Sequence, residues 1–189
     1  MKRAKLIEWS NKEEFKLLFF FFKLFLIWLS WKGIIGVLGE EFEASETKLF
    51  PSLSESWKAF NLATATWIMQ VSASLLNTLG FEAFSNGRQA WLSGTEGVIM
   101  GNYCIGFQLM YYFSMLIIIS PFSKLTKFIA VPIGIFLTFL LNIIRVAGLC
   151  LIVAYAPDYV FLAHDHLFNI LVFGVLLGFY YYLSSTNKK

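Results

Sequence analysis

Four long apolar stretches, separated by polar segments, dominate the chain and predict helices that cross a membrane. They cover residues 17–39, 103–120, 128–155 and 164–184. About 20 predominantly apolar residues are needed to cross the hydrocarbon core of a bilayer. The stretch at 103–120 contains no charged residue, whereas a surface helix of a soluble protein would show a polar face. We therefore expect these stretches to be four transmembrane helices.

Residues 59–80 are also helical by pattern, but they are too polar to span a bilayer. Their large apolar side chains, among them Leu62, Trp67 and Leu76, fall mostly on one face at helical spacing, and small or polar residues fill the remainder. Gly80 stands where a C-terminal cap is expected. The pattern predicts an amphipathic helix that lies in the membrane interface.

Residues 81–102 contain two turn sequences, Ser-Asn-Gly at 85–87 and Ser-Gly-Thr-Glu-Gly at 93–97. The segments between and after these turns, residues 88–92 and 97–101, have the length and spacing of two short antiparallel strands. We expect them to pair as a β-hairpin.

The distribution of lysine and arginine predicts the orientation of the helices. The segment 40–102, which opens with an acidic stretch, and the link at 156–163 are expected on the outer, periplasmic face. Because the helix at 59–80 belongs to that outer segment, it cannot cross the membrane. Positive charges concentrate in the three segments that the positive-inside rule places in the cytoplasm: residues 1–16, 121–127 and 185–189.

The composition agrees with a membrane protein. Hydrophobic residues make up 58% of the 189 residues, and 21 of them are Phe, whereas soluble domains are about 45–50% apolar. The net charge of +3 gives no argument for a nucleic acid partner. We expect no cleavable signal peptide, because the first apolar stretch is too long and no small-residue cleavage site follows it. The expected fold class is an all-α integral membrane bundle, formed by residues 1–189 as a single multi-pass domain of the inner membrane.

Arg145 is the most informative single residue, because it lies inside a predicted transmembrane helix. A charge in the bilayer interior is costly unless it is paired or hydrated, so it marks a candidate functional site. Asn142 lies one turn away on the same helix face. Arg145 is either satisfied by backbone carbonyls and helix contacts, or it supplies a fixed positive charge for a carboxylate or an oxyanion.

Cys104 lies at the predicted outer start of the second transmembrane helix. On its own it is a small apolar residue, but a thiol near a helix N-terminus with histidine and arginine in reach is activated as a nucleophile. Gly106 beside it permits close approach of a substrate chain or another helix. Cys150 lies in a continuous apolar run and is expected to serve packing alone. Two cysteines are too few for a disulfide framework, and we expect no disulfide between them.

His164 and His166 open the last predicted transmembrane helix at the outer face. A metal site is not expected, because no further cluster of histidine, cysteine or carboxylate residues supplies the remaining ligands. No cofactor is expected either. Cys104, Arg145 and one of the two histidines are predicted to surround one cavity at the outer face of the membrane.

In their order and spacing, these motifs resemble the exosortase/archaeosortase family of membrane transpeptidases, and the short chain is most similar to the compact exosortase F type. The resemblance covers about residues 60–184. It consists of a Leu-Leu-x-x-Leu-Gly helix end, a Cys-x-Gly, an Asn-x-x-Arg and a His that opens the last helix, carried by Leu75, Leu76, Leu79, Gly80, Cys104, Gly106, Asn142, Arg145 and His164.

The resemblance implies a cysteine protease or transpeptidase that cleaves secreted proteins near a C-terminal membrane-anchoring sorting signal. It assigns the nucleophile to Cys104, the acid/base role to His164 and the third essential role to Arg145. His164 is preferred to His166 because His-Asp-x-x-Phe is similar to the family's histidine motif. The implied reaction passes through a thioester, which an acceptor nucleophile then releases.

Two other classes of protein fit parts of the pattern. One is a non-enzymatic membrane assembly or transport component, in which Arg145 is structural and Cys104 is replaceable. The other is an intramembrane protease or acyltransferase of another family. For that class no Asp lies deep within the predicted transmembrane helices, since Asp158 stands in the outer link and Asp165 is only the second residue of the last predicted helix.

Overall fold

The computed structural model describes residues 13–38 and 51–186, and the chain divides into two compact units, Met1–Ser54 and Glu55–Lys189. Within the first unit, helix α2 (Glu13–Leu38) contains most of the first predicted transmembrane stretch. Most of the predicted cytoplasmic N-terminus, the start of the predicted outer segment and the end of the tail lie outside the described residues.

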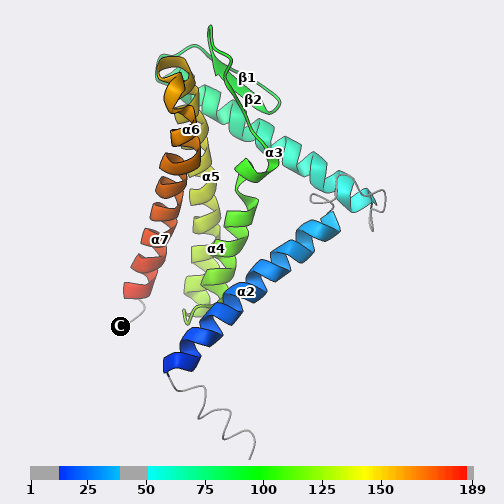
Figure 1. Ribbon diagram of the computed structural model, residues 1–189, viewed down its shortest axis with the longest axis vertical. Helices are drawn as coiled ribbons and strands as arrows, with labels where there is room; N and C mark the ends of the chain where they lie inside the picture. The colour runs from blue at the N-terminus through cyan, green and yellow to red at the C-terminus, as the bar shows by residue number, and fades with distance from the viewer. Residues whose placement is uncertain (1–12, 39–50, 187–189) are drawn as a thin grey trace, which may run out of the picture. The chain divides into compact units, whose positions relative to one another are not determined.

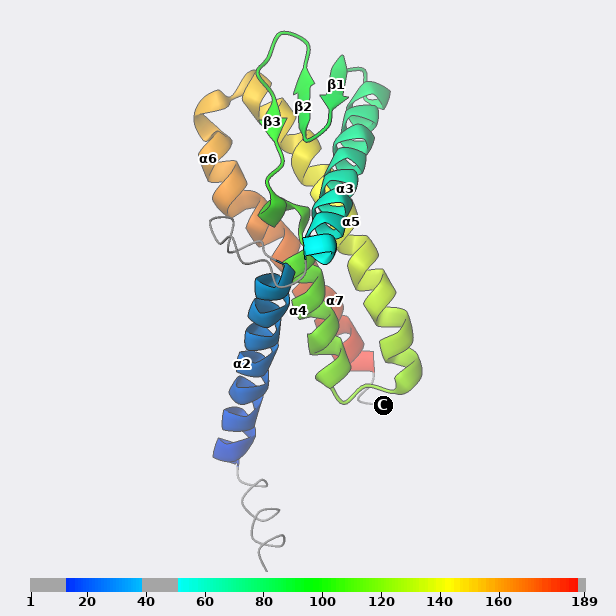
Figure 2. The same ribbon diagram turned by 90° about the vertical axis from the view of Figure 1, so that its right-hand side faces the viewer.

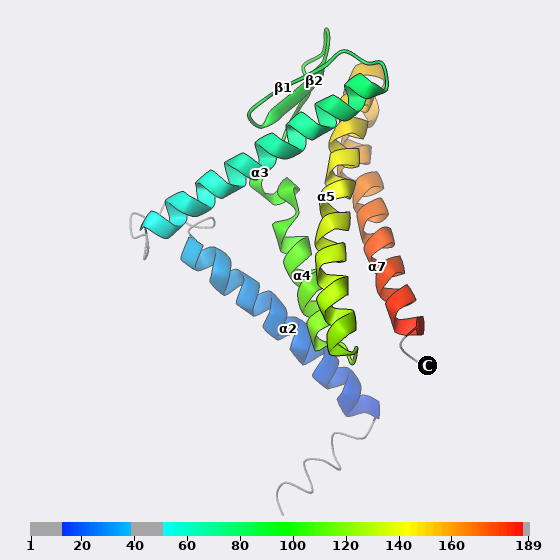
Figure 3. The ribbon, with the colours of Figure 1, turned by 180° about the vertical axis from the view of Figure 1, so that it is seen from behind.

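The second unit is a bundle of helices with a small sheet at one end (Figures 1 and 3). Its helices are α3 (Pro51–Thr78, mostly in this unit), α4 (Phe107–Ile119), α5 (Lys124–Tyr155), α6 (Val160–Leu162) and α7 (Phe168–Thr186). Helix α5 is central: buried residues of α3 and of the sheet pack against one part of it, and α4 and α7 pack against another. In the described part of the chain, two helical segments are long and apolar enough to cross a membrane, Lys124–Tyr155 and Pro157–Thr186.

The second predicted transmembrane helix is not continuous, so that prediction is wrong in its boundaries. Residues Asn102–Ile105 form the short 3₁₀-helix η1, and Gly106 with φ of 89° separates η1 from α4. Helix α4 has 13 residues and is therefore about 20 Å long, shorter than the roughly 30 Å core of a bilayer. Cys104 consequently lies in a separate turn before the helix, not at the helix start.

Helix α5 begins four residues before the predicted start at 128. Ser123 caps it by accepting a hydrogen bond at 3.1 Å from the backbone N–H of Thr126. Lys124 and Lys127 are therefore helical. Pro132 lies inside the helix, beyond its first two turns.

The link between the last two predicted transmembrane helices is more ordered than the sequence indicated. Residues Pro157–Tyr159 form the 3₁₀-helix η2, followed by α6 and by a π-helical segment, η3 (Ala163–Leu167), that leads directly into α7. Both histidines therefore lie inside a helical run and not at its first residue. Short π-helical segments are uncommon and occur often at functional sites.

The amphipathic helix is present as α3, but it begins at Pro51, eight residues before the predicted start. Proline is well tolerated at the first helical position, and the charged and serine residues after it are compatible with a helix. The predicted cap at Gly80 is confirmed. The backbone N–H of Gly80 donates to the carbonyl of Asn77 at 3.1 Å, and that of Phe81 donates to the carbonyl of Leu76 at 3.1 Å, which is a Schellman motif.

The sheet contains three antiparallel strands in the order β1 (Ala83–Asn86), β2 (Gln89–Leu92) and β3 (Val98–Ile99), as Figure 2 shows. The predicted pairing of residues 88–92 with 97–101 is confirmed, since Ala90 pairs with Val98. The first strand was not predicted. One face of the sheet packs against α5 through Ala90, which is 1% exposed, while Phe84 and Trp91 stack on the other face.

Candidate active site

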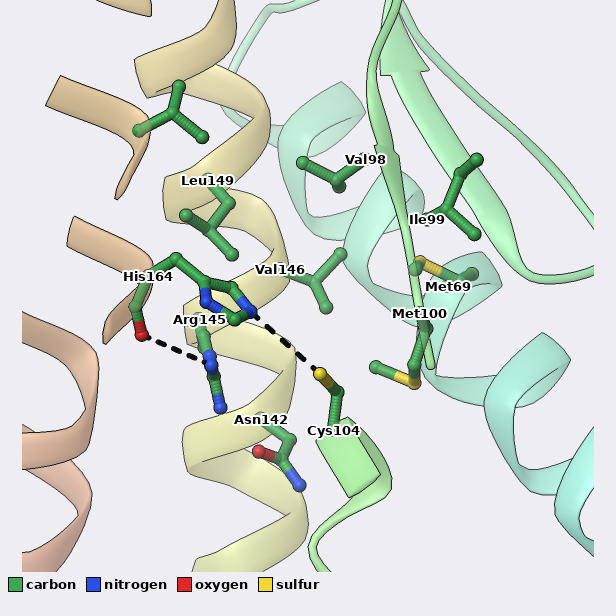
Figure 4. Close-up of a pocket in the computed structure, with 11 residues that line it drawn as sticks. Met69, Val98, Ile99, Met100, Cys104, Asn142, Arg145, Val146, Leu149 and His164 are labelled. Atoms are coloured by element: carbon green, nitrogen blue, oxygen red, sulfur yellow. Dashed lines mark hydrogen bonds between the residues drawn. The ribbon is translucent and has the colours of Figure 1, made fainter. Parts of the chain in front are cut away.

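A cavity of about 100 Å³ lies where α3, β3, η1, α5, α6 and η3 meet (Figure 4). Cys104, Asn142, Arg145 and His164 all line it. These residues come from three separate segments of the chain, so the predicted convergence around one cavity is present in the structure. The remaining lining residues are apolar, with Met69 and Met100 among them.

Cys104 and His164 form the central contact of the cavity. The Sγ atom of Cys104 lies 3.8 Å from Nε2 of His164, and both residues are partly buried (Figure 4). Sulfur has a larger radius than oxygen, so this separation is within hydrogen-bonding distance for a thiol. A proton can therefore pass from the thiol to the imidazole without any rearrangement of the chain.

The other ring nitrogen of His164 contacts a carboxylate. Nδ1 lies 2.6 Å from Oδ1 of Asp165. Because a carboxylate can only accept, Nδ1 must carry the hydrogen, and in the neutral ring Nε2 is then left as the acceptor that faces Cys104. Asp165 was placed at the start of the last predicted helix by the sequence, and no role was predicted for it. In the sequence, only its position next to His164 pointed to a role for Asp165.

Arg145 approaches the same histidine through the backbone. Its guanidinium donates a hydrogen bond at 3.2 Å to the carbonyl oxygen of His164. In an α-helix the N–H of Phe168 would bond to the carbonyl of His164, four residues earlier. In the π-helical segment this N–H bonds instead to the carbonyl of Ala163, five residues earlier, so the His164 carbonyl loses that partner. Among the ion pairs between described residues, none involves Arg145. Its positive charge thus borders the cavity without a direct ion pair among the described residues, although the Asp165 carboxylate interacts with it at longer range.

Asn142 fixes the turn that carries Cys104. Its buried side-chain amide donates at 2.6 Å to the carbonyl of Ile105, the residue before the break at Gly106. A β-carbon at Gly106 would lie 2.7 Å from Nδ2 of Asn142 and 3.2 Å from Thr138. The predicted close approach at Gly106 is therefore made by α5. Both supporting residues position η1 on that helix.

We expect Gly106→Ala to lower the free energy of unfolding by about 2–5 kcal/mol, because the backbone there is left-handed and the added methyl group meets Asn142. The measurement is thermal unfolding in detergent micelles followed by circular dichroism. Gly101→Ala is the matched control, since no atom lies within 4 Å of its β-carbon position and its φ is −75°. Equal melting temperatures for the two variants would contradict the packing argument.

A second contact, which was not predicted, holds the other side of η1. Nη1 of Arg88, in the turn between β1 and β2, donates at 2.6 Å to Oδ1 of Asn102 and at 3.3 Å to the carbonyl of Met100. The end of β3 and the turn with Cys104 are thereby tied to the turn between β1 and β2. The sequence did not indicate this contact, because Arg88 was expected in a strand and instead lies in the turn before β2.

His166 and Cys150 lie away from this arrangement. His166 is exposed and does not line the cavity. Cys150 is 0% exposed, and its thiol donates to the carbonyl of Ala90 at 3.6 Å, which is a packing role between α5 and the sheet. Both cysteines are free thiols. Among the described residues, no group of three or more His, Cys, Asp or Glu side chains has the geometry to hold a metal ion.

The family model described as transmembrane exosortase matches residues 47–182, a range that contains every residue of the cavity. No curated protein and no solved structure matches the chain.

Proposed function

Because this chain belongs to the transmembrane exosortase family, we propose that it is a membrane-embedded cysteine transpeptidase that cleaves secreted proteins near a C-terminal membrane-anchoring signal. We further propose that it is of the compact F type. The observation that carries the proposal is the contact between the Cys104 thiol and Nε2 of His164 in a cavity that also contains Arg145. No cofactor or metal takes part in this reaction.

The proposed reaction has two steps. His164 Nε2 accepts the thiol proton, and the sulfur of Cys104 attacks the carbonyl carbon of the scissile peptide bond. The C–N bond then breaks, His164 returns the proton to the leaving amine, and the acyl group remains on sulfur as a thioester. A second nucleophile attacks the thioester and releases Cys104: an amine acceptor gives transpeptidation, and water gives hydrolysis.

Arg145 is proposed to stabilise the negative charge that develops on the carbonyl oxygen during attack. One N–H group of its guanidinium binds the His164 carbonyl, which fixes the side chain, and the remaining donors are available to the cavity. In a site lined mainly by apolar residues, such a preorganised charge is worth more than it would be in water.

The topology that we propose has four transmembrane helices, in α2, in the η1–α4 segment, in α5 and in the segment that ends with α7. The two longest apolar segments support two of these crossings. The short α4 then requires η1 or local thinning of the bilayer to complete its crossing. The cavity would face the periplasmic side of the inner membrane, and a substrate anchored by its own transmembrane helix would reach it by lateral diffusion.

The first test is the rate at which iodoacetamide alkylates each cysteine of the purified protein, read by peptide mass spectrometry. We expect Cys104 to react at least about tenfold faster than Cys150, because Cys104 is partly exposed beside His164 and Cys150 is fully buried. His164→Gln should lower the rate at Cys104, which stays above that of the buried Cys150, and His166→Gln, a matched change of an exposed histidine, should not lower it. An impermeant maleimide applied to intact cells reports whether Cys104 faces outward.

The alternative of a non-enzymatic assembly or transport component predicts a different result. In that case Cys104 would react as an ordinary half-buried thiol, and its rate would be the same in wild type, His164→Gln and His166→Gln. Labelling of Cys104 only after the cells are permeabilised would overturn the proposed orientation and leave the chemistry to be judged from the purified protein.

A further inference from the structure

Strand β3 has a free edge within the part of the chain that the structure describes. The sheet order is β1-β2-β3, so among the described strands β3 is paired on one side only. Its pairing with β2 is antiparallel, with Gln89 opposite Ile99 and Ala90 opposite Val98. The backbone N–H of Met100 continues the ladder by donating to the carbonyl of Arg88 at 2.8 Å.

The ladder determines which backbone groups are available at this edge. In an antiparallel pair, residues that exchange hydrogen bonds alternate with residues whose N–H and C=O point away from the partner strand. Met100 bonds to β2, so its neighbour Ile99 directs its N–H and C=O away from the sheet. Ile99 is also 75% exposed. One donor and one acceptor are thus presented at the open side of β3.

This edge borders the candidate active site. Val98, Ile99 and Met100 all line the cavity that contains Cys104 and His164. Successive side chains of a strand point to opposite faces, so three consecutive residues can line one cavity only if it runs along the edge of the strand. Figure 2 shows β3 as the strand nearest to α6, and Val160 of α6 lines the same cavity.

A substrate in the proposed reaction needs a partner of this kind. The carbonyl next to a membrane anchor is hydrogen-bonded when it lies in a helix, and the helix must unwind before a thiol can attack it. Each backbone group released by unwinding near the bilayer costs free energy unless another partner replaces the lost bond. An open strand edge beside the thiol offers such replacement bonds.

We infer that an extended segment of the substrate adds to β3 as a fourth strand, pairs with the backbone of Ile99, and thereby carries its scissile carbonyl to Cys104. The inference rests on the proposed function and names the form in which the substrate binds. Strand addition takes its affinity from main-chain hydrogen bonds, and alternate side chains enter adjacent pockets. The apolar lining, which includes Met69, Val98 and Leu149, selects small or apolar side chains at those alternate positions.

The test uses two probes that alkylate thiols with loss of chloride, applied to the purified full-length protein in detergent micelles. One is a tetrapeptide chloromethyl ketone of alternating valine and alanine, and the other is chloroacetamide, which has no peptide. Each rate at Cys104 is measured by intact mass and divided by the rate with free cysteine. We expect the ratio of these two rates to be higher for the peptide probe than for chloroacetamide, because only the peptide has backbone groups that can pair with β3. We call this difference the peptide enhancement. A peptide of simple sequence suffices, because strand pairing uses backbone groups and does not depend on the sequence of the peptide.

Two variants of one residue separate the backbone from the side chain. Ile99→Pro removes the outward N–H while the bonds between β2 and β3 stay intact, since proline is tolerated where the N–H of an edge strand faces outward. Ile99→Ala keeps the N–H and removes most of the side chain. We expect Ile99→Pro to lower the peptide enhancement about tenfold, as for loss of one well-made hydrogen bond, and Ile99→Ala to retain it.

A third measurement works on the wild-type protein and does not depend on how Ile99→Pro folds. Peptide probes that carry one N-methylated amide should lose rate only at alternate positions, because alternate N–H groups face β3. An enhancement that is equal in Ile99→Pro and Ile99→Ala, or insensitive to N-methylation at every position, would overturn the inference. So would a dimer of this protein that Ile99→Pro converts to monomer, since a second copy would then occupy the edge.

The failures of the inference and of the proposed function are distinguishable. If chloroacetamide reacts with Cys104 no faster in wild type than in His164→Gln, the cysteine is not activated and the proposed function fails. If that rate depends on His164 but the peptide probe shows no enhancement, the catalytic pair stands and the strand-addition inference alone fails.

Discussion

Cys104→Ser is expected to reduce acyl transfer from a short apolar peptide p-nitrophenyl ester on the order of 10³-fold or more. The ester supplies an activated acyl group, so the assay requires the nucleophile and its base but not the natural sorting signal. A serine hydroxyl in place of the thiol remains almost entirely protonated beside one imidazole, so it is a poor nucleophile. The remaining rate acceleration then comes only from positioning of the ester and from the charge in the cavity. Release of p-nitrophenol gives the rate, and intact mass gives the acyl-enzyme on Cys104.

Cys150→Ser is the matched control for this loss. The thiol of Cys150 donates to the carbonyl of Ala90 in a fully buried contact, and a serine hydroxyl can donate to the same carbonyl. We expect this variant to keep the wild-type rate of nitrophenol release. If the acyl group appears on Cys150, or if Cys104→Ser retains the wild-type rate, Cys104 is not the nucleophile and the family role does not apply to it.

The parts of the fold that were predicted from the sequence are those set by residues close together in the chain, where no tertiary contact favours another local structure. Gly80 ends α3 because only glycine adopts the left-handed conformation there without strain, and the Schellman bonds follow from it. The pairing of β2 with β3 follows from the turn at residues 93–97 between two short strands. Asn142 and Arg145 share a helix face because of their spacing.

The interruption at Gly106 was not predicted, because an apolar run without charges satisfies the criteria for one helix through its whole length. A glycine inside such a run is compatible with a helix and costs only about 1 kcal/mol. Here the amide of Asn142 offers the carbonyl of Ile105 a partner from another helix, and the chain takes the left-handed conformation at Gly106. A tertiary hydrogen bond decided the local structure.

The sequence favoured His164 over His166 only through the resemblance of His-Asp-x-x-Phe to a family motif, and the backbone feature that separates the two rings has no sequence signal. The π-helical segment at Ala163–Leu167 sets the directions of the two rings, and it brings His164 to Cys104 while His166 stays exposed. The same segment presents the His164 carbonyl to Arg145. The two interpretations of Arg145 are therefore compatible: a backbone carbonyl anchors the guanidinium, and its charge still faces the cavity.

Asp165→Asn is expected to lower the rate of nitrophenol release about 10²-fold, with KM unchanged. Asp165 does not line the cavity; it acts as a positioning residue through Nδ1 of His164 at 2.6 Å. An asparagine that turns its amide N–H groups toward Nδ1 places the ring hydrogen on Nε2, which can then no longer accept the thiol proton. An asparagine that turns its oxygen keeps the tautomer but stabilises the imidazolium less, because its charge is absent.

Asp158→Asn makes the matched comparison, since it removes the same charge from an exposed carboxylate in η2, six residues before His164 in the sequence. We expect it to keep the wild-type kcat. A fall in kcat in Asp165→Asn alone, with unchanged KM and an unchanged melting temperature, would show that the carboxylate acts on the histidine and not on binding or folding. Equal rates for the two variants would mean that the ring of His164 is held by the π-helical backbone and by Arg145, and that Asp165 contributes no more than a surface charge.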